Sequence, residues 1–356
     1  MTETKKRKII AIVGPTASGK TAIGVKLAKE FNGEIVSADS RQIFRGLDLG
    51  TGKDLSEYNG VKYHLIDICD PEDEFNLFKY LELARLVIED IFSRGKVPII
   101  VGGTGLYVQA LVEGFELKPM DVISTPQLCL RAEKSSNKRS LHVGRDDTGG
   151  RGNNERGREQ LNNLTIEQLQ RILKDLKEQS FEKLVDKQNP HRLIRAIERA
   201  QSGEEMIKIK PDFEVLQIGL EWPREILNER IDRRVDERFK QGMLSEAEGL
   251  VEAGIDINWL VGLGLEYRII GLYLLIQNLK FKIQNDNEKL KINKLIVNCK
   301  LKIENFESFN AMKQTLKVRS HQYAKRQMTW FKRFSEIVWE IDYEKIAQLV
   351  KSFLNK

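Results

Sequence analysis

The segment GPTASGKT (residues 14–21) constrains the fold of this chain more than any other feature. It matches the pattern G-x-x-x-x-G-K-[ST] of phosphate-binding loops. The apolar run before it (residues 8–13) predicts a buried strand, and the segment after it (residues 21–31) predicts a helix. Because such a loop needs a strand before it and a helix after it, the flanks support the motif.

The loop predicts an anion site made of backbone N–H groups and the positive end of the following helix. Lys20 adds a mobile positive charge, and the hydroxyl of Thr21 is suited to a Mg²⁺ ion. The predicted phosphate ligands are Gly14, Pro15, Thr16, Ala17, Ser18, Gly19, Lys20 and Thr21. The pattern leaves the phosphate compound open, because nucleotide-binding enzymes that use ATP share it.

The composition indicates a water-soluble protein with a polyanionic partner. The 356 residues carry a net charge of +6, and 31% of them are charged. The first eight residues lack the apolar core of a signal peptide, and no stretch is long and apolar enough to span a membrane. The three cysteines form no C-x-x-C pair. We therefore expect a reduced, cytoplasmic protein without a membrane partner.

The first hundred residues alternate between strand and helix patterns. A helical pattern covers residues 75–94, and a later apolar segment, residues 213–222, is expected to rejoin the sheet. The three other strand candidates after the first are residues 34–38, 63–68 and 97–101. Strands that alternate with helices predict an α/β fold, with a mostly parallel sheet covered by helices on both faces.

The chain divides into three predicted regions. Residues 1–121 form the core with the phosphate loop, residues 122–212 form a helical insertion, and residues 213–356 complete the core and add basic C-terminal helices. Within the insertion, residues 134–163 are polar and rich in glycine and arginine, which predicts a disordered loop or an arm that orders on RNA. Residues 279–310 repeat a Lys/Ile/Asn pattern, which favours a low-complexity surface insertion over edge strands.

Polar residues follow two of the predicted strands. Asp39, Ser40, Arg41 and Gln42 end one strand, and Thr104 follows another. Ligands of open α/β sheets bind where the strands end, so these side chains are expected near the phosphate loop. Two other interpretations stay open: Asp39 as the magnesium-binding acid of an ATP-using enzyme, and Thr104 as a helix N-cap.

The segment from residue 224 to residue 239 predicts an amphipathic helix with arginines beside its buried stripe. Arg230 and Arg234 lie next to the stripe and are expected to reach inward to a phosphate, whereas Arg233 and Arg238 are expected to point elsewhere. Salt bridges on a solvated face are the alternative for this helix.

The segment from residue 313 to residue 333 holds seven Lys or Arg residues and no acid, interleaved with Tyr323, Trp330 and Phe331. Basic residues attract the phosphate backbone and aromatic side chains stack on unpaired bases, so the segment favours RNA binding. A core helix with a solvated basic face would share this pattern.

Together these segments resemble the bacterial tRNA dimethylallyltransferases (Δ2-isopentenyl diphosphate:tRNA transferases). The matching segments, in order, are GPTASGKT, SADSRQIFRGLDLGTGK, VGGTGLYVQALVEG, NPHRLIRAIE, ERIDRRVDERFKQGML, LGLEYR and AKRQMTWFKR. The sequence departs from the family where TPQLC places Cys129, with Arg131 two residues on, at the usual position of an arginine. It departs again in the two unusual stretches described above.

The resemblance implies a P-loop NTPase-like core and a prenyl transfer reaction. The loop would hold dimethylallyl diphosphate with Mg²⁺, and N6 of the tRNA adenosine 3′-adjacent to the anticodon, position 37, would attack the allylic carbon. In the matching positions, Asp39 is the base, Thr104 orients the nucleophile and Gln42 reads the adenine. The family's diphosphate-binding arginine falls on Arg230 or Arg234.

The resemblance further implies binding of the anticodon stem-loop of tRNA, and we expect a monomer. An adenylate isopentenyltransferase, a small-molecule P-loop kinase and a non-catalytic RNA-binding nucleotide switch remain the alternatives. The positions expected to contact tRNA are Asp39, Ser40, Arg41, Gln42, Thr104, Gln188, Asn189, Pro190, His191, Arg192, Leu265, Glu266, Tyr267, Arg268, Lys325 and Arg326.

Overall fold

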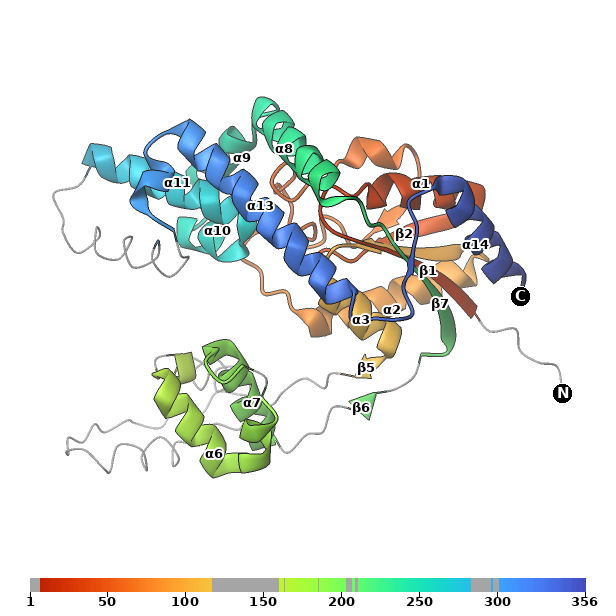
Figure 1. The fold of residues 1–356 in the computed structure, drawn as a ribbon, viewed down its shortest axis with the longest axis horizontal. Helices are drawn as coiled ribbons and strands as arrows, with labels where there is room; N and C mark the ends of the chain where they lie inside the picture. The colour runs from red at the N-terminus through yellow and green to blue at the C-terminus, as the bar shows by residue number, and fades with distance from the viewer. Residues whose placement is uncertain are drawn as a thin grey trace. The chain divides into compact units, whose positions relative to one another are not determined.

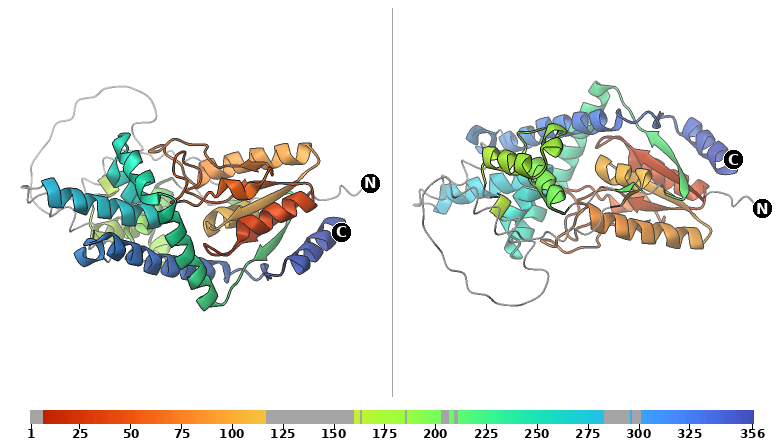
Figure 2. Two further views of the ribbon diagram at one scale, coloured as in Figure 1. Left: turned by 90° about the horizontal axis from the view of Figure 1, so that it is seen from above. Right: turned by 90° about the horizontal axis from the view of Figure 1, so that it is seen from below.

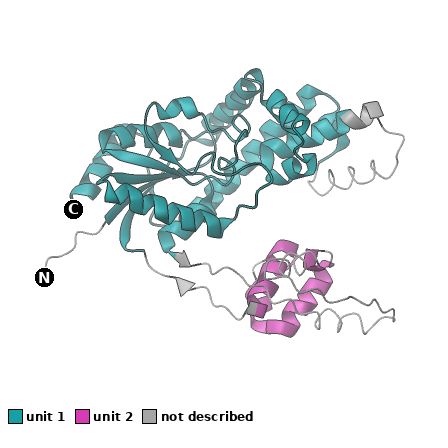
Figure 3. Cartoon of the chain, turned by 180° about the vertical axis from the view of Figure 1, so that it is seen from behind, with its two compact units in different colours: residues 1–114, 210–356 teal, residues 115–209 magenta. Residues whose placement is uncertain are grey.

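The computed structural model describes residues 7–116, 160–162, 164–184, 186–202, 207–208, 211–282, 296 and 301–356. The chain divides into two compact units, coloured separately in Figure 3. Unit 1 comprises Met1–Gly114 with Lys210–Lys356, and unit 2 comprises Phe115–Ile209. The sequence analysis set the corresponding borders at residues 121 and 212.

Unit 1 is built on a six-stranded sheet with the order β3-β2-β4-β1-β7-β8, in which every neighbouring pair is parallel. The expectation that the segment from Phe213 rejoins the sheet is confirmed, because β7 pairs with β1 along its whole length. The strands are β1 (Arg7–Val13), β2 (Gly33–Ser37), β3 (Tyr63–His64), β4 (Val97–Gly102), β7 (Phe213–Gly219) and β8 (Val338–Trp339).

Strand β3 is shorter than the six-residue strand that the sequence predicted. Leu65 and Asp67 have φ values of 63° and 55°, which a strand does not tolerate. The apolar run therefore ends in a turn, and the turn sends the carboxylate of Asp67 toward a buried lysine described below.

Helices cover both faces of this sheet, as the fold class predicted (Figure 2). Helices α1 and α14 share a hydrophobic core with alternate residues of β1, β2 and β4. Helices α2 and α3 lie on the opposite face, where the rings of Tyr80 and Tyr107 stack with their centroids 4.1 Å apart. Their bounds are α1 (Lys20–Glu30), α14 (Tyr343–Asn355), α2 (Leu77–Ser93) and α3 (Gly105–Glu113).

A second group of helices packs beside the carboxyl ends of the strands (Figure 1). Ile43, Phe44 and Leu47, which follow β2, are buried in one core with these helices. The loop that carries the predicted site residues is therefore fixed by C-terminal helices. They are α8 (Arg224–Lys240), α9 (Met243–Glu252), α10 (Ile257–Leu263), α11 (Leu265–Lys282) and α13 (Phe309–Phe331), with the short turn η2 (Ile303–Phe306). The other short turn, η1 (Leu55–Tyr58), packs against α1 instead.

Unit 2 contains two packed helices, α6 (Ile166–Glu182) and α7 (Pro190–Ser202), around a small apolar core. It also holds an antiparallel pair, β5 (Phe115–Glu116) with β6 (Ile207–Lys208). The sequence predicted no strand between residues 121 and 212, so β6 corrects that prediction. Most of residues 134–163 lie outside the described residues. Within residues 279–310 the described Ile296, Leu301 and Phe306 are buried in the core of unit 1, which corrects the prediction of a surface insertion; most of the other residues of this stretch lie outside the described part.

Candidate active site

The phosphate loop has the backbone that its glycines require. Gly14 has a φ of 149° and Gly19 a φ of 90°. A Cβ on Gly14 would lie 2.9 Å from the carbonyl oxygen of Leu220 in the segment after β7, so only glycine fits there. Gly19 is the N-cap of α1, which aims the first N–H groups of that helix at the loop.

A cleft opens beside this loop at the carboxyl ends of β2 and β4. The cleft gathers charged and polar side chains from five separate segments of unit 1. Its lining residues are Thr16, Lys20, Thr21, Asp39, Arg41, Gln42, Thr51, Gly52, Tyr58, Val101, Gly102, Gly103, Arg234, Arg238, Glu266, Tyr323 and Gln327.

Lys20 is the cation of the loop. Its Nζ donates to the carbonyl oxygen of Pro15 at 2.6 Å. Burial and the neighbouring Arg234 lower the pKa of Lys20 to about 7, and the carboxylate of Asp39 partly opposes this shift. A bound anion would favour the charged form of this lysine.

Asp39 stands at the end of β2 and lines the cleft. Its Oδ1 accepts a hydrogen bond from the backbone N–H of Arg41 at 2.9 Å. Thr104 lies beside this turn, where its Oγ1 accepts from the backbone N–H of Ser40 at 3.1 Å. Thr104 occupies the N-cap position of α3, yet its hydroxyl makes no capping hydrogen bond. Its hydroxyl instead fixes the residue next to the carboxylate.

The two side chains that follow Asp39 are already engaged within the protein. Arg41 donates from Nη1 to Oε2 of Glu266 at 2.8 Å and lies 5.5 Å from the ring centre of Tyr323. The amide of Gln42 accepts from Ser37 Oγ and donates to the carbonyl of Gly52, both at 3.0 Å. If Gln42 recognises a base, one of its two hydrogen bonds within the protein must be replaced by a hydrogen bond to that base.

Helix α8 presents its arginines to the loop in different ways. Arg230 donates from Nε to the carbonyl of Ala17 at 2.8 Å and stacks over Trp222, so it holds the loop from outside. Arg234 lines the cleft and lies 3.4 Å from Thr16 Oγ1 through its Nη1. Of the two candidates for a diphosphate ligand, the geometry favours Arg234.

The prediction that Arg238 points away from the loop is wrong. Arg238 is 6% exposed and lines the cleft together with Arg234. Because Arg238 lies four residues after Arg234, both guanidinium groups lie on one face of the helix. The prediction placed Arg230 and Arg234 on that face but left out Arg238. Arg233, by contrast, is exposed as predicted.

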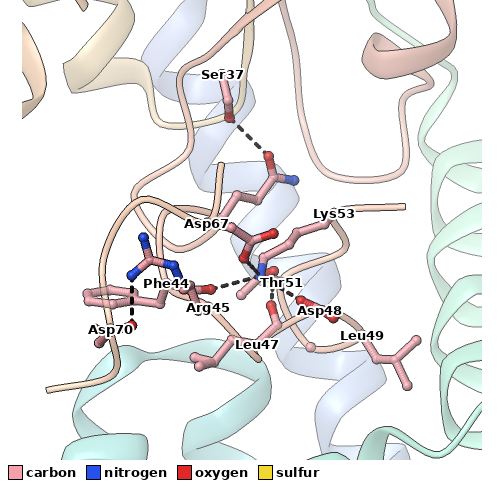
Figure 4. A network of polar contacts seen from close by, with 12 residues as sticks. Ser37, Phe44, Arg45, Leu47, Asp48, Leu49, Thr51, Lys53, Asp67 and Asp70 are labelled. Atoms are coloured by element: carbon pink, nitrogen blue, oxygen red, sulfur yellow. Dashed lines mark hydrogen bonds and ion pairs between the residues drawn. The ribbon is translucent and has the colours of Figure 1, made fainter. Parts of the chain in front are cut away.

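Lys53, for which the sequence predicted no role, organises the loop after β2 (Figure 4). Its buried Nζ donates to the carbonyl of Phe44 at 2.8 Å, to Oδ1 of Asp48 at 2.6 Å and to Oδ1 of Asp67. The ammonium group therefore uses its three donors to close the turn that ends at Gly52. A lysine within GTGK offered no signal that distinguishes it from a surface lysine.

Gln327 was also missed. This residue of α13 is 8% exposed; its Oε1 accepts from the N–H of Thr16 and its Nε2 donates to the carbonyl of Gly103, both at 2.9 Å. One side chain thus joins the phosphate loop to the loop after β4. The many basic residues of α13 led to a prediction of RNA binding for this segment, and no role was predicted for Gln327.

The aromatic residues of α13 correct the stacking prediction. Phe331 is 2% exposed and lies in the core, and the ring of Trp330 packs against the backbone of Gly105. Only Tyr323 among the three lines the cleft. Lys325 and Arg326 are exposed, as an RNA contact requires.

The other predicted tRNA contacts are distributed between the two units. Tyr267 is 1% exposed and its hydroxyl donates to Oε1 of Glu246 at 2.5 Å, so its burial contradicts a direct tRNA contact. Leu265 is partly buried, and Arg268 donates from Nε to the carbonyl of Val261 at 3.0 Å. In unit 2 the positions before and within the first turn of α7 are exposed or partly exposed: Gln188, Asn189, Pro190, His191 and Arg192.

The cleft suits a magnesium ion that arrives with a phosphate ligand. The hydroxyl of Thr21 lines it next to the phosphate loop. Within the described residues there is no group of three or more His, Cys, Asp or Glu side chains that would hold a metal by itself. This donor set fits Mg²⁺, which keeps several waters and binds through one or two protein oxygens plus substrate phosphates.

The parallel sheet, the glycine loop and the cleft of charged groups define a P-loop α/β protein with an anion-binding site. The model of the IPP transferase family matches residues 42–334, and that of the isopentenyl transferase family matches residues 7–64. The chain therefore belongs to the IPP transferase family. No helix in the described part of the chain has the length and apolar character to cross a membrane.

Relatives and solved structures agree with this assignment. The tRNA dimethylallyltransferase 2 of Shewanella sediminis is 37% identical over 335 residues, which cover 93% of this chain and 91% of that protein. The tRNA dimethylallyltransferase 1 of Syntrophus aciditrophicus is 35% identical and covers 98% of this chain and 99% of its own length. The structure of a tRNA isopentenylpyrophosphate transferase from Bacillus halodurans matches with a TM-score of 0.60 at 30% identity, covering 99% of this chain and 96% of that chain.

Proposed function

We propose that this protein transfers a dimethylallyl group from dimethylallyl diphosphate to an adenosine of tRNA. Its relatives named tRNA dimethylallyltransferase match over nearly the whole chain. The structural observation that carries the proposal is one cleft lined by the ammonium of Lys20, the guanidinium of Arg234 and the carboxylate of Asp39. An anion site and a base thus face the same space.

The reaction exchanges a C–O bond for a C–N bond. The electron pair of the adenine N6 forms the bond to the allylic carbon, and the electron pair of the breaking C–O bond leaves with the diphosphate. Negative charge therefore develops on the diphosphate, where Lys20, Arg234 and the loop N–H groups stabilise it. The N6 proton passes to Asp39, which we assign as the general base.

Three features support the remaining assignments. The Thr104 hydroxyl holds the backbone beside Asp39, so we assign it the task of fixing that carboxylate. The hydroxyl of Thr21 would hold a Mg²⁺ ion in the cleft, and the ion would supply positive charge next to the leaving diphosphate. An adenine N6 within a stacked anticodon loop is out of reach of a cleft, so we infer that the base 3′ of the anticodon flips out.

The test is to incubate the protein with dimethylallyl diphosphate, Mg²⁺ and unmodified tRNA, and to follow the tRNA by mass spectrometry. We expect one dimethylallyl group per tRNA, located on the adenosine 3′-adjacent to the anticodon. Transfer to free AMP in place of tRNA would contradict the proposal and favour an adenylate isopentenyltransferase. Phosphate transfer from ATP to a small molecule would favour a kinase.

The variant Asp39→Asn refines the test. Loss of a general base costs roughly 10²–10⁴-fold in rate, and diphosphate binding should persist because the loop is unchanged. The matched control is Asp70→Asn, which alters an exposed carboxylate after β3 that pairs with Arg45 of the loop after β2. A single-turnover rate for Asp39→Asn within tenfold of the control would place the base elsewhere.

A further inference from the structure

Arg238 is a buried cation with an incomplete set of partners. It is 6% exposed, and its Nε has no hydrogen-bond partner within the described residues. Its Nη2 lies 3.4 Å from Oδ2 of Asp54, and the same oxygen lies 3.3 Å from Nη2 of Arg234. Two guanidinium groups thus share one carboxylate oxygen, each at the upper limit of a hydrogen-bond distance.

The chain brings this pair into the cleft by a close backbone approach. Gly52 has a φ of 65°, and a Cβ there would collide with the guanidinium groups of both Arg234 and Arg238. The same two arginines lie beside the phosphate loop, where they line a hollow with Thr16 and Ala17. Any side chain at position 52 would push the two guanidinium groups away from that loop.

The local charge favours a further anion. Burial and the nearby Arg234 lower the pKa of Arg238 to about 10, so the group is still a cation at neutral pH. Lys20 adds a further positive centre to the same cleft, in which the carboxylates are Asp39 and Glu266 and the latter is paired with Arg41. Asp54, by contrast, is 37% exposed in its side chain and meets the two guanidinium groups only at 3.3 and 3.4 Å, so a rotation of its side chain toward solvent would release them.

We propose that Arg238 is a second diphosphate-binding guanidinium and that Asp54 is a resident anion which the substrate's diphosphate displaces from it. This inference rests on the proposed function. The planar N–H donors of arginine bind carboxylate and phosphate oxygens in the same geometry, so a phosphate oxygen can take the place of the Asp54 carboxylate. Asp54 then limits the repulsion between the buried Arg238 and the neighbouring, partly exposed Arg234 in the free protein.

The test is calorimetric titration of the full-length protein with inorganic diphosphate and Mg²⁺. Arg238→Met, which keeps the length of the side chain and removes its charge, should weaken diphosphate binding by about tenfold or more. Arg233→Met is the matched control, because Arg233 lies on the same helix and is exposed. It should bind diphosphate like the wild type.

Asp54→Asn tests the exchange itself. Removal of the competing charge should tighten diphosphate binding severalfold, and the gain should disappear when Asp54→Asn is combined with Arg238→Met. If Arg238→Met does not fold, Arg238→Lys and Asp54→Asn still decide the matter, since Arg238→Lys should retain part of the affinity. Thermal midpoints of all variants separate a folding defect from a binding defect.

The outcomes separate two failures. A wild-type protein that does not bind diphosphate overturns the proposed function. A wild-type protein that binds diphosphate, with Arg238→Met binding equally well, overturns only the role of Arg238. Weaker binding by Asp54→Asn shows that Asp54 positions the arginines and overturns the exchange.

Discussion

The Nζ of Lys53 donates to Oδ1 of Asp48 at 2.6 Å, although the side chain of Lys53 is fully buried and that of Asp48 is 56% exposed. The ion pair closes the turn from Asp48 to Lys53 over the core of unit 1. Gly52, inside this turn, accepts from Gln42 in the cleft and touches Arg234. The lysine therefore positions cleft residues without touching a ligand.

Lys53→Met should destabilise the fold and impair the cleft together. The buried carbonyl of Phe44 would lose its donor, which costs about 1–3 kcal/mol. Because Gly52 would also be released, the KM for dimethylallyl diphosphate should rise by more than the loss of folded protein explains. Thermal unfolding and steady-state kinetics below the unfolding midpoint provide the measurement.

The matched control is Lys62→Met, since the side chain of Lys62 is 58% exposed and its Nζ lies 4.0 Å from Glu34. It should leave both the midpoint and KM nearly unchanged. A Lys53→Met protein with a lowered midpoint but an unchanged KM would show that the turn is stable without the ion pair.

Diphosphate binding should take up a proton above neutral pH because of Lys20. In the free protein its pKa is about 7, down from 10.5, and a bound anion raises it again. Below about pH 7 the Lys20 ammonium is already charged, so diphosphate binding takes up few protons. Above that pH the affinity for diphosphate should fall by up to about tenfold for each pH unit. Calorimetry in buffers of different ionisation enthalpy measures the proton uptake directly.

Lys20→Arg is the control for this prediction, because arginine stays protonated throughout the range. The ionisation of the diphosphate itself is common to both proteins, so the difference between them isolates Lys20. Equal proton uptake by both proteins would contradict a titrating lysine in the loop.

Sequence reasoning reached the sheet, the loop and the polar strand ends because each has a local signal. The glycines of the loop are required by backbone geometry, and Asp39 follows an apolar strand directly. Residues at the ends of parallel strands meet at one edge whatever the rest of the chain does. Asp39 and Lys20 therefore appeared together in the cleft, as expected.

The rest of the cleft depends on contacts between distant segments. Gln327 meets Thr16 across 311 positions of the chain, and Lys53 is buried only because three acceptors surround it. Arg238 shares the helix face of Arg234 by its four-residue spacing, but the close approach of Gly52 to both guanidinium groups is a contact between segments far apart in the chain. Whether such a side chain is buried depends on tertiary packing, which a local sequence pattern does not contain.

The exposed charges of α13 should contribute to tRNA binding. Lys325→Ala combined with Arg326→Ala removes two exposed cations, so the slope of log affinity against log salt should flatten by up to about two. The charge-matched control combines Lys29→Ala with Lys351→Ala, both exposed on helices α1 and α14. Filter binding of tRNA over a series of salt concentrations measures the slope for both double variants. Equal slopes would show that α13 does not contact the RNA.

Gln327 should act through the two hydrogen bonds of its neutral amide, and two substitutions separate this role from its shape. Gln327→Leu leaves the N–H of Thr16 and the carbonyl of Gly103 without their partners, so diphosphate binding should weaken. Gln327→Glu keeps the shape and one acceptor, but it sets a carboxylate against the Gly103 carbonyl and adds negative charge to the cleft.

We therefore expect diphosphate affinity to decrease from wild type to Gln327→Leu and further to Gln327→Glu. If Gln327 served packing alone, the order of the two variants would reverse, because glutamate preserves the volume of glutamine. Gln322→Glu on the exposed side of α13 is the control and should bind diphosphate like the wild type. Titration with inorganic diphosphate in the presence of Mg²⁺ ranks all four proteins.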